Sequence, residues 1–199
     1  MKKDNSTFSY KRQLRLHLLK EISNPVIMET HGGKGKIFKA CYNDFSGIVF
    51  EKEGEKADLL AIQRPNWFVY ECNCLDAIEM GAGKGMGINF VDIDPYGDPW
   101  PVINTFFNCE NYRPNILAMA VNDGLRLKLK MGGAWAVGSV QTAIKKYGNA
   151  EIGRRYKEIC QETMIELANN NGYQLKRWTS YYCGYAKQIT HYAAILYQR

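Results

Sequence analysis

The residues of this chain that are best placed to do chemistry are acids that follow short apolar segments. Four such acids are Glu29, Glu51, Asp76 and Asp94, and each lies at or just after a run typical of a buried strand. The carboxyl ends of parallel strands lie at one edge of a sheet, where open α/β proteins bind their ligands. We therefore expect these carboxylates to line a single site.

A glycine-rich turn follows the first of these acids, with Gly32, Gly33 and Gly35 lying within four positions. Glycine permits positive φ and lets a ligand approach the backbone closely. An acid that ends the second strand, Glu51, can accept hydrogen bonds from both hydroxyls of a ribose. An acid just after the third strand, Asp76 beside Ala77, can accept from the exocyclic amine of adenine. The pattern predicts a pocket for an adenosine-containing ligand.

The charge of the turn narrows the choice of ligand. The chain has no GxxxxGK[ST] sequence, and Lys34 lies inside the turn rather than after it. The carboxylate of Glu29 would repel a pyrophosphate but would suit a cation such as a sulfonium with an amino-acid tail. This argument favours S-adenosylmethionine over NAD or ATP.

The run Asp94-Pro95-Tyr96-Gly97 follows the fourth apolar segment. Methyl transfer to the exocyclic amine of a base is hindered because the nitrogen lone pair is delocalised into the ring. The Asp94 carboxylate and the Pro95 carbonyl could both accept from that amine and orient it, while Tyr96 stacks on the base. We predict these three as catalytic residues, and a turn after a buried strand is the simpler alternative.

With these motifs in view, the chain resembles the class I S-adenosylmethionine-dependent methyltransferases. The resemblance implies that Glu29 and Gly33 flank the methionine moiety, that Glu51 holds the ribose and that Asp76 holds the adenine. Gly35 also matches the glycine turn of that family, whereas His31 stands at its first glycine position and Gly32 is additional.

The run that begins at Asp94 is similar to the Asp-Pro-Phe-Gly signature of the tRNA guanine-N2 dimethyltransferases. Here tyrosine replaces the phenylalanine, and Asp98 replaces the small residue before Pro99. The resemblance implies an RNA acceptor. That family carries a further C-terminal tRNA-binding domain, for which we expect no counterpart here.

The elements that position these residues alternate between strand and helix. We expect strands at 26–29, 47–51, 67–70, 88–94, 116–121, 173–183 and 190–197, and helices at 34–44, 55–62, 74–80, 99–107 and 149–171. Such alternation predicts a Rossmann-like, doubly wound, mostly parallel seven-stranded sheet with helices on both faces and a C-terminal antiparallel strand. Residues 1–199 form one domain in this interpretation.

Residues 1–24 are expected to form a helical extension that covers one edge of the sheet. Leu14, Leu18, Leu19 and Ile22 recur at helical spacing, which places the basic side chains on other faces. Those basic residues are Lys11, Arg12, Arg15 and Lys20.

A basic region lies between residues 122 and 155, in a chain whose net charge is +6. Arg126, Lys128, Lys130, Arg154 and Arg155 could follow a phosphate backbone beside the catalytic residues. A solvated face is the alternative interpretation. The segment 125–130 alternates apolar and basic residues, which suits a strand or an irregular surface segment.

The remaining features exclude several classes of protein. No segment has the pattern of a signal peptide or the length of a membrane span, so we expect a soluble cytoplasmic protein with reduced thiols. Cys72 and Cys74 lack a second Cys or His pair at ligand spacing, so we expect no metal site. We also expect Asp92 and Asp94 to face opposite ways and therefore not to share an ion.

Several functions stay open at this level. The acceptor of the methyl group could be DNA, a protein or a small molecule instead of RNA. The chain could also be a non-catalytic relative that retains the cofactor pocket and binds RNA, or an NAD-dependent oxidoreductase.

Overall fold

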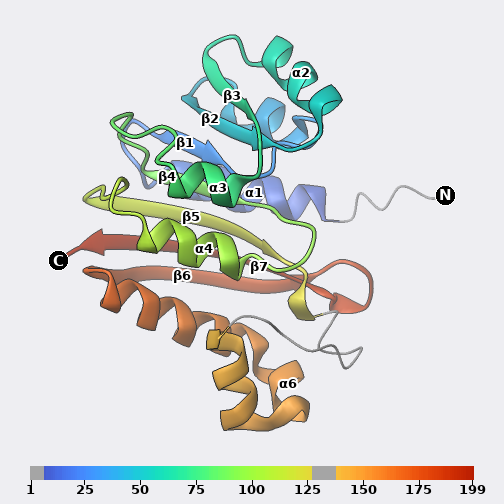
Figure 1. Ribbon diagram of the computed structural model, residues 1–199. Coiled ribbons are helices and arrows are strands. Elements are labelled where there is room, and N and C mark those ends of the chain that lie inside the picture. Colours follow the sequence, from blue (N-terminus) through green and yellow to red (C-terminus); the bar gives the residue numbers. More distant parts are fainter. Residues whose placement is uncertain (1–6, 127–137) are drawn as a thin grey trace.

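A computed structural model describes residues 7–126 and 138–199, in which the strands form one mixed sheet (Figure 1). Its seven strands lie in the order β3-β2-β1-β4-β5-β7-β6. They are β1 (Val26–Glu29), β2 (Ser46–Glu51), β3 (Trp67–Glu71), β4 (Phe90–Ile93), β5 (Ile116–Asp123), β6 (Tyr173–Cys183) and β7 (Ile189–Gln198). β1 to β5 run parallel, and β7 is antiparallel to both β5 and β6. The expected doubly wound sheet is confirmed.

Helices cover both faces of this sheet. They are α1 (Phe8–Leu19), α2 (Gly54–Gln63), α3 (Cys74–Glu79), α4 (Trp100–Asn108) and α6 (Gly138–Asn170), with a π-helix η1 (Phe38–Tyr42) and a 3-10 helix η2 (Tyr185–Lys187). One apolar core joins the sheet to α3, α4 and α6, and a second joins it to α1, η1 and Leu60 of α2. Figure 1 shows α3 and α4 in front of the strands and α1 behind them.

Three helices differ from the expectation. The segment predicted as a regular helix at 34–44 becomes helical only at Lys36, and most of it is the π-helix, which buries Phe38, Cys41 and Tyr42. The helix predicted at 149–171 is the second half of α6, which begins earlier and breaks at Gly148 (φ 74°, ψ 156°). In the segment 125–130, Leu125 and Arg126 are helical, and residues 127–130 lie outside the described residues.

The third helix that differs is α1, whose position on the sheet depends on a buried cation. Arg15, expected on a face turned away from the core, is fully buried together with Leu14 and Leu18. A guanidinium is buried only when acids accept its hydrogen bonds, because an unpaired buried charge is very costly. The acid that accepts from Arg15 is Asp92 of β4.

None of the helices in the described ranges is long and apolar enough to cross a membrane.

Candidate active site

The strands that run parallel end at one edge of the sheet, on the right in Figure 1. The turns after β1, β2 and β4 meet there, so this edge brings together Glu29, His31, Gly33, Glu51 and Asp94, as the sequence predicts. Two elements that the sequence did not assign to the site, α1 and the end of β5, also reach it.

The glycine turn after β1 is fixed by β2. The Gly32 amide donates to the Phe50 carbonyl at 3.0 Å, and the Gly33 amide donates to Oε2 of Glu51 at 2.8 Å. A Cβ on Gly32 would lie 2.4 Å from Cδ1 of Leu60 and 2.6 Å from Cγ2 of Val49, so any other residue here would force these buried side chains to move. Gly33 has φ +53° and open space on its Cβ side, which leaves room for a ligand beside the backbone.

Glu51 joins this turn to the end of β2. Its Oε1 accepts from the Glu53 amide at 3.1 Å, while Oε2 accepts from Gly33. A carboxylate has about four acceptor positions, so two remain for the hydroxyls of a bound ligand. Only 9% of Glu51 is exposed, and its orientation is therefore set by the backbone before any ligand binds.

His31 fills the gap between the turn and α3. The Thr30 hydroxyl donates to the Asp92 carbonyl at 3.1 Å, so its oxygen accepts from Nδ1 of His31 at 2.8 Å. This assignment leaves a lone pair on Nε2, which lies 3.9 Å from Sγ of Cys74. Burial lowers the pKa of His31, so the ring is neutral at physiological pH. Within α3, Asp76 is exposed and Ala77 is buried.

Glu29 lies beneath the turn rather than in an open pocket. Nη1 of Arg64 donates to its Oε2 at 2.5 Å, and the side chains of Arg64 and Glu29 are 0% and 4% exposed, respectively. Arg64 also lies 4.3 Å from the centre of the Phe38 ring. Burial raises the pKa of Glu29 to about 7 despite this cation. The charge that was expected to attract a sulfonium is therefore already paired inside the protein.

Asp94 is held by two side chains that lie far from it in sequence. Nζ of Lys11 donates to both of its oxygens, at 2.9 and 2.8 Å, and Nδ2 of Asn122 donates to Oδ1. Burial acts to raise the pKa of Asp94, but the charges of Lys11 and Arg15 outweigh it and lower the pKa. The side chain is 24% exposed, so an ionised carboxylate remains accessible at this edge.

The segment after Asp94 presents an aromatic ring to solvent. Tyr96 is fully exposed, and Gly97 has φ +136°. The Gly124 amide donates to the Gly97 carbonyl at 2.7 Å, and a Cβ on Gly124 would lie 3.1 Å from the Gly97 Cα. The end of β5 thus fixes the loop that carries Pro95 and Tyr96.

Asp94, directly after β4, lies on the same side as Asp92 of β4, since both accept hydrogen bonds from α1, so the expectation that they face opposite ways is wrong. They are two residues apart, and side chains at that spacing point to the same side of a strand. Asp92 accepts from Nε and Nη2 of Arg15 at 2.7 and 2.5 Å, and from the Tyr42 hydroxyl at 2.6 Å. Among the described residues, no cluster of three or more potential ligands could hold a metal.

The docking of α1 has a simple geometric basis. Lys11 and Arg15 are four residues apart, about 6 Å along a helix axis. Asp92 and Asp94 are two residues apart, about 6.6 Å along a strand. The two cations therefore match the two carboxylates. The spacing of apolar residues does not indicate these two ion pairs, because Arg15 and Asp92 are 77 residues apart and Lys11 and Asp94 are 83 residues apart.

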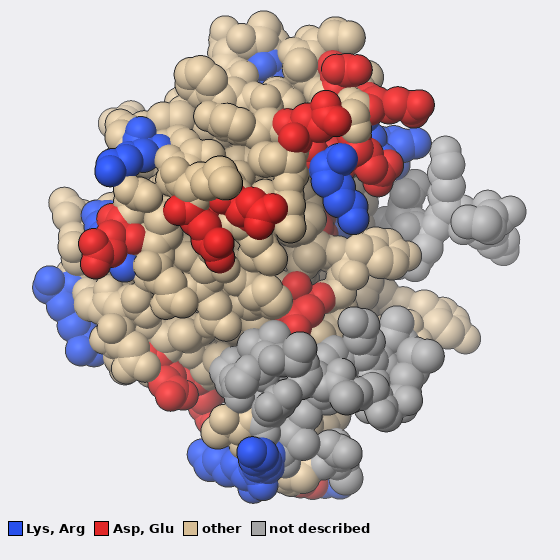
Figure 2. Space-filling view, in the orientation of Figure 1, with Lys and Arg blue, Asp and Glu red and all other residues tan. Residues whose placement is uncertain are grey.

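The basic region is only partly free to bind a polyanion. Arg126 donates from Nε and Nη2 to the Gly153 carbonyl, at 3.3 and 3.2 Å, and from Nη1 to the Lys187 carbonyl. Arg155 pairs with Glu162 at 3.7 Å, and Arg154 pairs with Glu151 at 3.3 Å although 79% of its side chain is exposed. Lys128 and Lys130 lie outside the described residues. Figure 2 shows basic side chains over α6 and acidic ones near the ends of β2 and β3.

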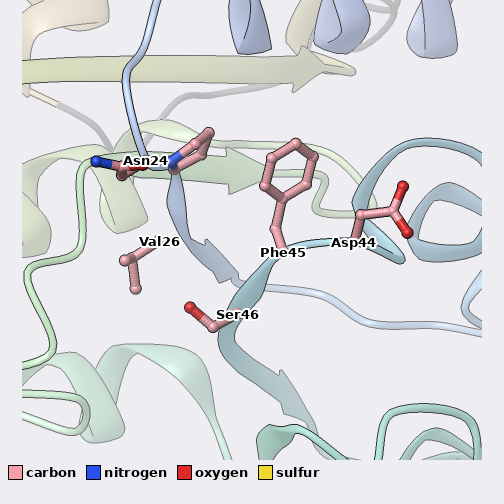
Figure 3. A pocket seen from close by; sticks show the side chains of 6 residues that line it. Asn24, Val26, Asp44, Phe45 and Ser46 are labelled. Carbon is pink, nitrogen blue, oxygen red and sulfur yellow. The ribbon is translucent and has the colours of Figure 1, made fainter.

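A cavity of about 470 Å³ lies at the opposite edge of the sheet (Figure 3). It is lined by residues at the start of β1 and β2 and in the turns before them: Asn24, Pro25, Val26, Asp44, Phe45 and Ser46. These residues include none of the predicted site residues, and the cavity faces the amino ends of the strands. It is therefore distinct from the candidate active site.

Comparison with solved structures connects this fold to known proteins. M. jannaschii TYW2, solved in complex with AdoMet, aligns over 100% of this chain and 79% of its own with a TM-score of 0.59 and 12% identity. The N-methyltransferase NodS from Bradyrhizobium japonicum WM9, solved with S-adenosyl-L-homocysteine, aligns over 98% and 89% with a TM-score of 0.64 and 9% identity. PH1948 from Pyrococcus horikoshii, described as a proposed RNA methyltransferase, aligns over 98% and 86% with a TM-score of 0.54 and 11% identity.

No model of a known protein family matches the sequence, and no curated protein matches it either. The structural likeness establishes that the chain has the fold of S-adenosylmethionine-dependent methyltransferases.

Proposed function

We propose that this protein is a methyltransferase that uses S-adenosylmethionine and methylates an exocyclic amine of a base in RNA. The observation that carries the proposal is the placement of an ionised, accessible Asp94 two residues before the fully exposed Tyr96, at the ligand-binding edge of a methyltransferase fold. The sequence around Asp94 resembles the signature of the tRNA guanine-N2 dimethyltransferases, and we propose the N2 amine of guanine as the target class.

The residues of the glycine turn fit the cofactor. Glu51 is preoriented and retains acceptor positions for two ribose hydroxyls, and Gly33 offers open backbone beside it. Asp76 is exposed at the first turn of α3, where it can accept from the adenine amine. When bound, the cofactor supplies an electrophilic methyl group on a sulfonium. Gly35 supports the turn. Glu29 and Arg64 form a buried pair that would position the turn, and the neutral ring of His31 would line the site.

On the acceptor side, the chain orients the nucleophile rather than forming a covalent bond to it. Asp94 and the Pro95 carbonyl accept from the target amine and direct its nitrogen towards the methyl group, and Tyr96 stacks on the base. Arg154 and the other basic residues of the 122–155 region would contact phosphates.

A second candidate function has one observation in its favour. Three of the predicted phosphate-binding residues, Arg126, Arg154 and Arg155, already bind carbonyl or carboxylate oxygens of the protein through their guanidinium groups. A weak phosphate track would suit a protein or small-molecule acceptor of the same methyl group.

The proposal is tested by incubating the purified protein with methyl-labelled S-adenosylmethionine and separate pools of RNA, DNA and protein. We expect label in RNA, on the N2 of guanine. Asp94→Ala should abolish turnover and leave the cofactor dissociation constant nearly unchanged, whereas Asp44→Asn, at the opposite edge, should change neither. Label only in another pool would refute the RNA assignment, and undiminished turnover of Asp94→Ala would refute the role of Asp94.

A further inference from the structure

The contact between Lys11 and Asp94 is unusual for an acceptor site, because it puts a cationic amine where the target amine is proposed to bind. Lys11 donates to both carboxylate oxygens and Asn122 donates to Oδ1, which leaves about one of four acceptor positions free. A target amine that donates to Asp94 therefore competes with the ammonium of Lys11 for the same carboxylate.

Lys11 is not a surface lysine that happens to reach an acid. Its helix is fixed by the fully buried pair of Arg15 with Asp92, one helical turn further on. The ring of Tyr10 packs against Tyr181 at 5.8 Å between centroids, and the Tyr181 hydroxyl donates to the Tyr10 carbonyl at 2.9 Å. Lys11 itself remains 20% exposed, so its flexible side chain can leave Asp94 without moving α1.

A displaced Lys11 needs another anion. The neighbouring carboxylate, Asp92, already accepts three hydrogen bonds from Arg15 and Tyr42. A phosphate of the acceptor can supply that anion, since an ammonium is a common phosphate ligand. A neutral nucleoside or a cationic peptide cannot supply it.

We propose that Lys11 is a specificity-determining residue that holds Asp94 in the free protein and moves to a phosphate of the nucleic-acid acceptor when the target amine binds Asp94. The inference rests on the proposed function and goes beyond it. In this proposal, the protein selects a phosphate-bearing strand over a free nucleoside at Asp94 itself, because Lys11 exchanges the Asp94 carboxylate for a phosphate.

Binding gives a test that does not depend on turnover. The dissociation constant of a single-stranded guanine-containing oligoribonucleotide is measured by fluorescence anisotropy at several salt concentrations for the wild type, Lys11→Met, Lys11→Arg and Lys20→Met. Loss of one phosphate contact should reduce the slope of log K against log salt by about 0.7 in Lys11→Met. Lys11→Arg should keep the wild-type slope, and so should Lys20→Met, which removes an exposed lysine of the same helix region.

Turnover gives the second test. In Lys11→Met, guanosine no longer competes with an ammonium, so the preference for the oligonucleotide over guanosine in kcat/KM should fall about fivefold, as expected for a partly exposed ion pair. An unchanged salt slope, or an equal fall in kcat/KM for both acceptors, would overturn the exchange of partners while leaving the methyltransferase proposal intact. If the wild type neither binds nor methylates RNA, both proposals fail together.

Discussion

Arg15→Met removes the cation from a fully buried ion pair and should strongly destabilise the protein. Arg15 and Asp92 are 0% and 1% exposed, and Arg15 donates two hydrogen bonds to that carboxylate. Methionine fills similar volume but leaves Asp92 buried with only the Tyr42 hydroxyl as a donor. Removing one partner of such a pair costs about 3–5 kcal/mol, which is a large share of the roughly 5–15 kcal/mol that stabilises a typical domain.

Urea unfolding, followed by circular dichroism, measures this loss. With a slope of about 2 kcal/mol per molar urea, the midpoint should fall by about 2 M. The informative control is the double variant Arg15→Met/Asp92→Asn, which removes the unpaired charge as well and should recover most of the lost stability. A loss below about 1 kcal/mol in the single variant would show that the pair lies in a wetter environment than the structure indicates.

Two further predictions concern other carboxylates. Glu51→Gln should weaken S-adenosylmethionine binding about 10- to 100-fold, because the amide has only one oxygen to accept from both the Gly33 amide and the ligand hydroxyls. Calorimetric titration measures the affinity, and Glu79→Gln, on the exposed side of α3, is the control. An unchanged affinity would show that Glu51 does not bind the cofactor. Asp123 is fully buried, and this burial raises its pKa to about 7, although the Leu125 amide and the Tyr156 hydroxyl donate to it. The folded state therefore holds a proton that the unfolded chain releases near pH 4, so this group reduces stability as pH rises from about 4 to about 7. Asp123→Asn should show a smaller loss of unfolding free energy between pH 5 and pH 8 than the wild type, and an equal loss would contradict the buried, protonated state.

The sheet could be predicted from sequence because its strands carry their signals locally. Apolar runs such as 48–50 and the acids after them define the parallel strands and their carboxyl edge, and Gly172, with φ +76°, ends α6 as expected. The glycine turn and Glu51 also come together as predicted, because adjacent parallel strands place their ends side by side.

The partners of the buried charges could not be predicted in the same way. Arg15 and Arg64 look like surface residues in a helical pattern, and nothing near them in sequence indicates the acids that accept from them. Their burial depends on packing between distant elements. The same holds for the contact of Lys11 with Asp94, so the sequence indicated Asp94 as a candidate site residue but did not indicate the cation that pairs with it.

The long separation between α1 and β4 has a consequence for the order of folding. The Gly33–Glu51 hydrogen bond spans 18 residues, whereas the Lys11–Asp94 contact spans 83. Closing a longer loop costs more chain entropy, and contacts of high sequence separation form slowly. We expect the half of the edge around the glycine turn to form first. The half around Asp94 should form later, because it needs α1 to pack against β4, which lies much further along the chain.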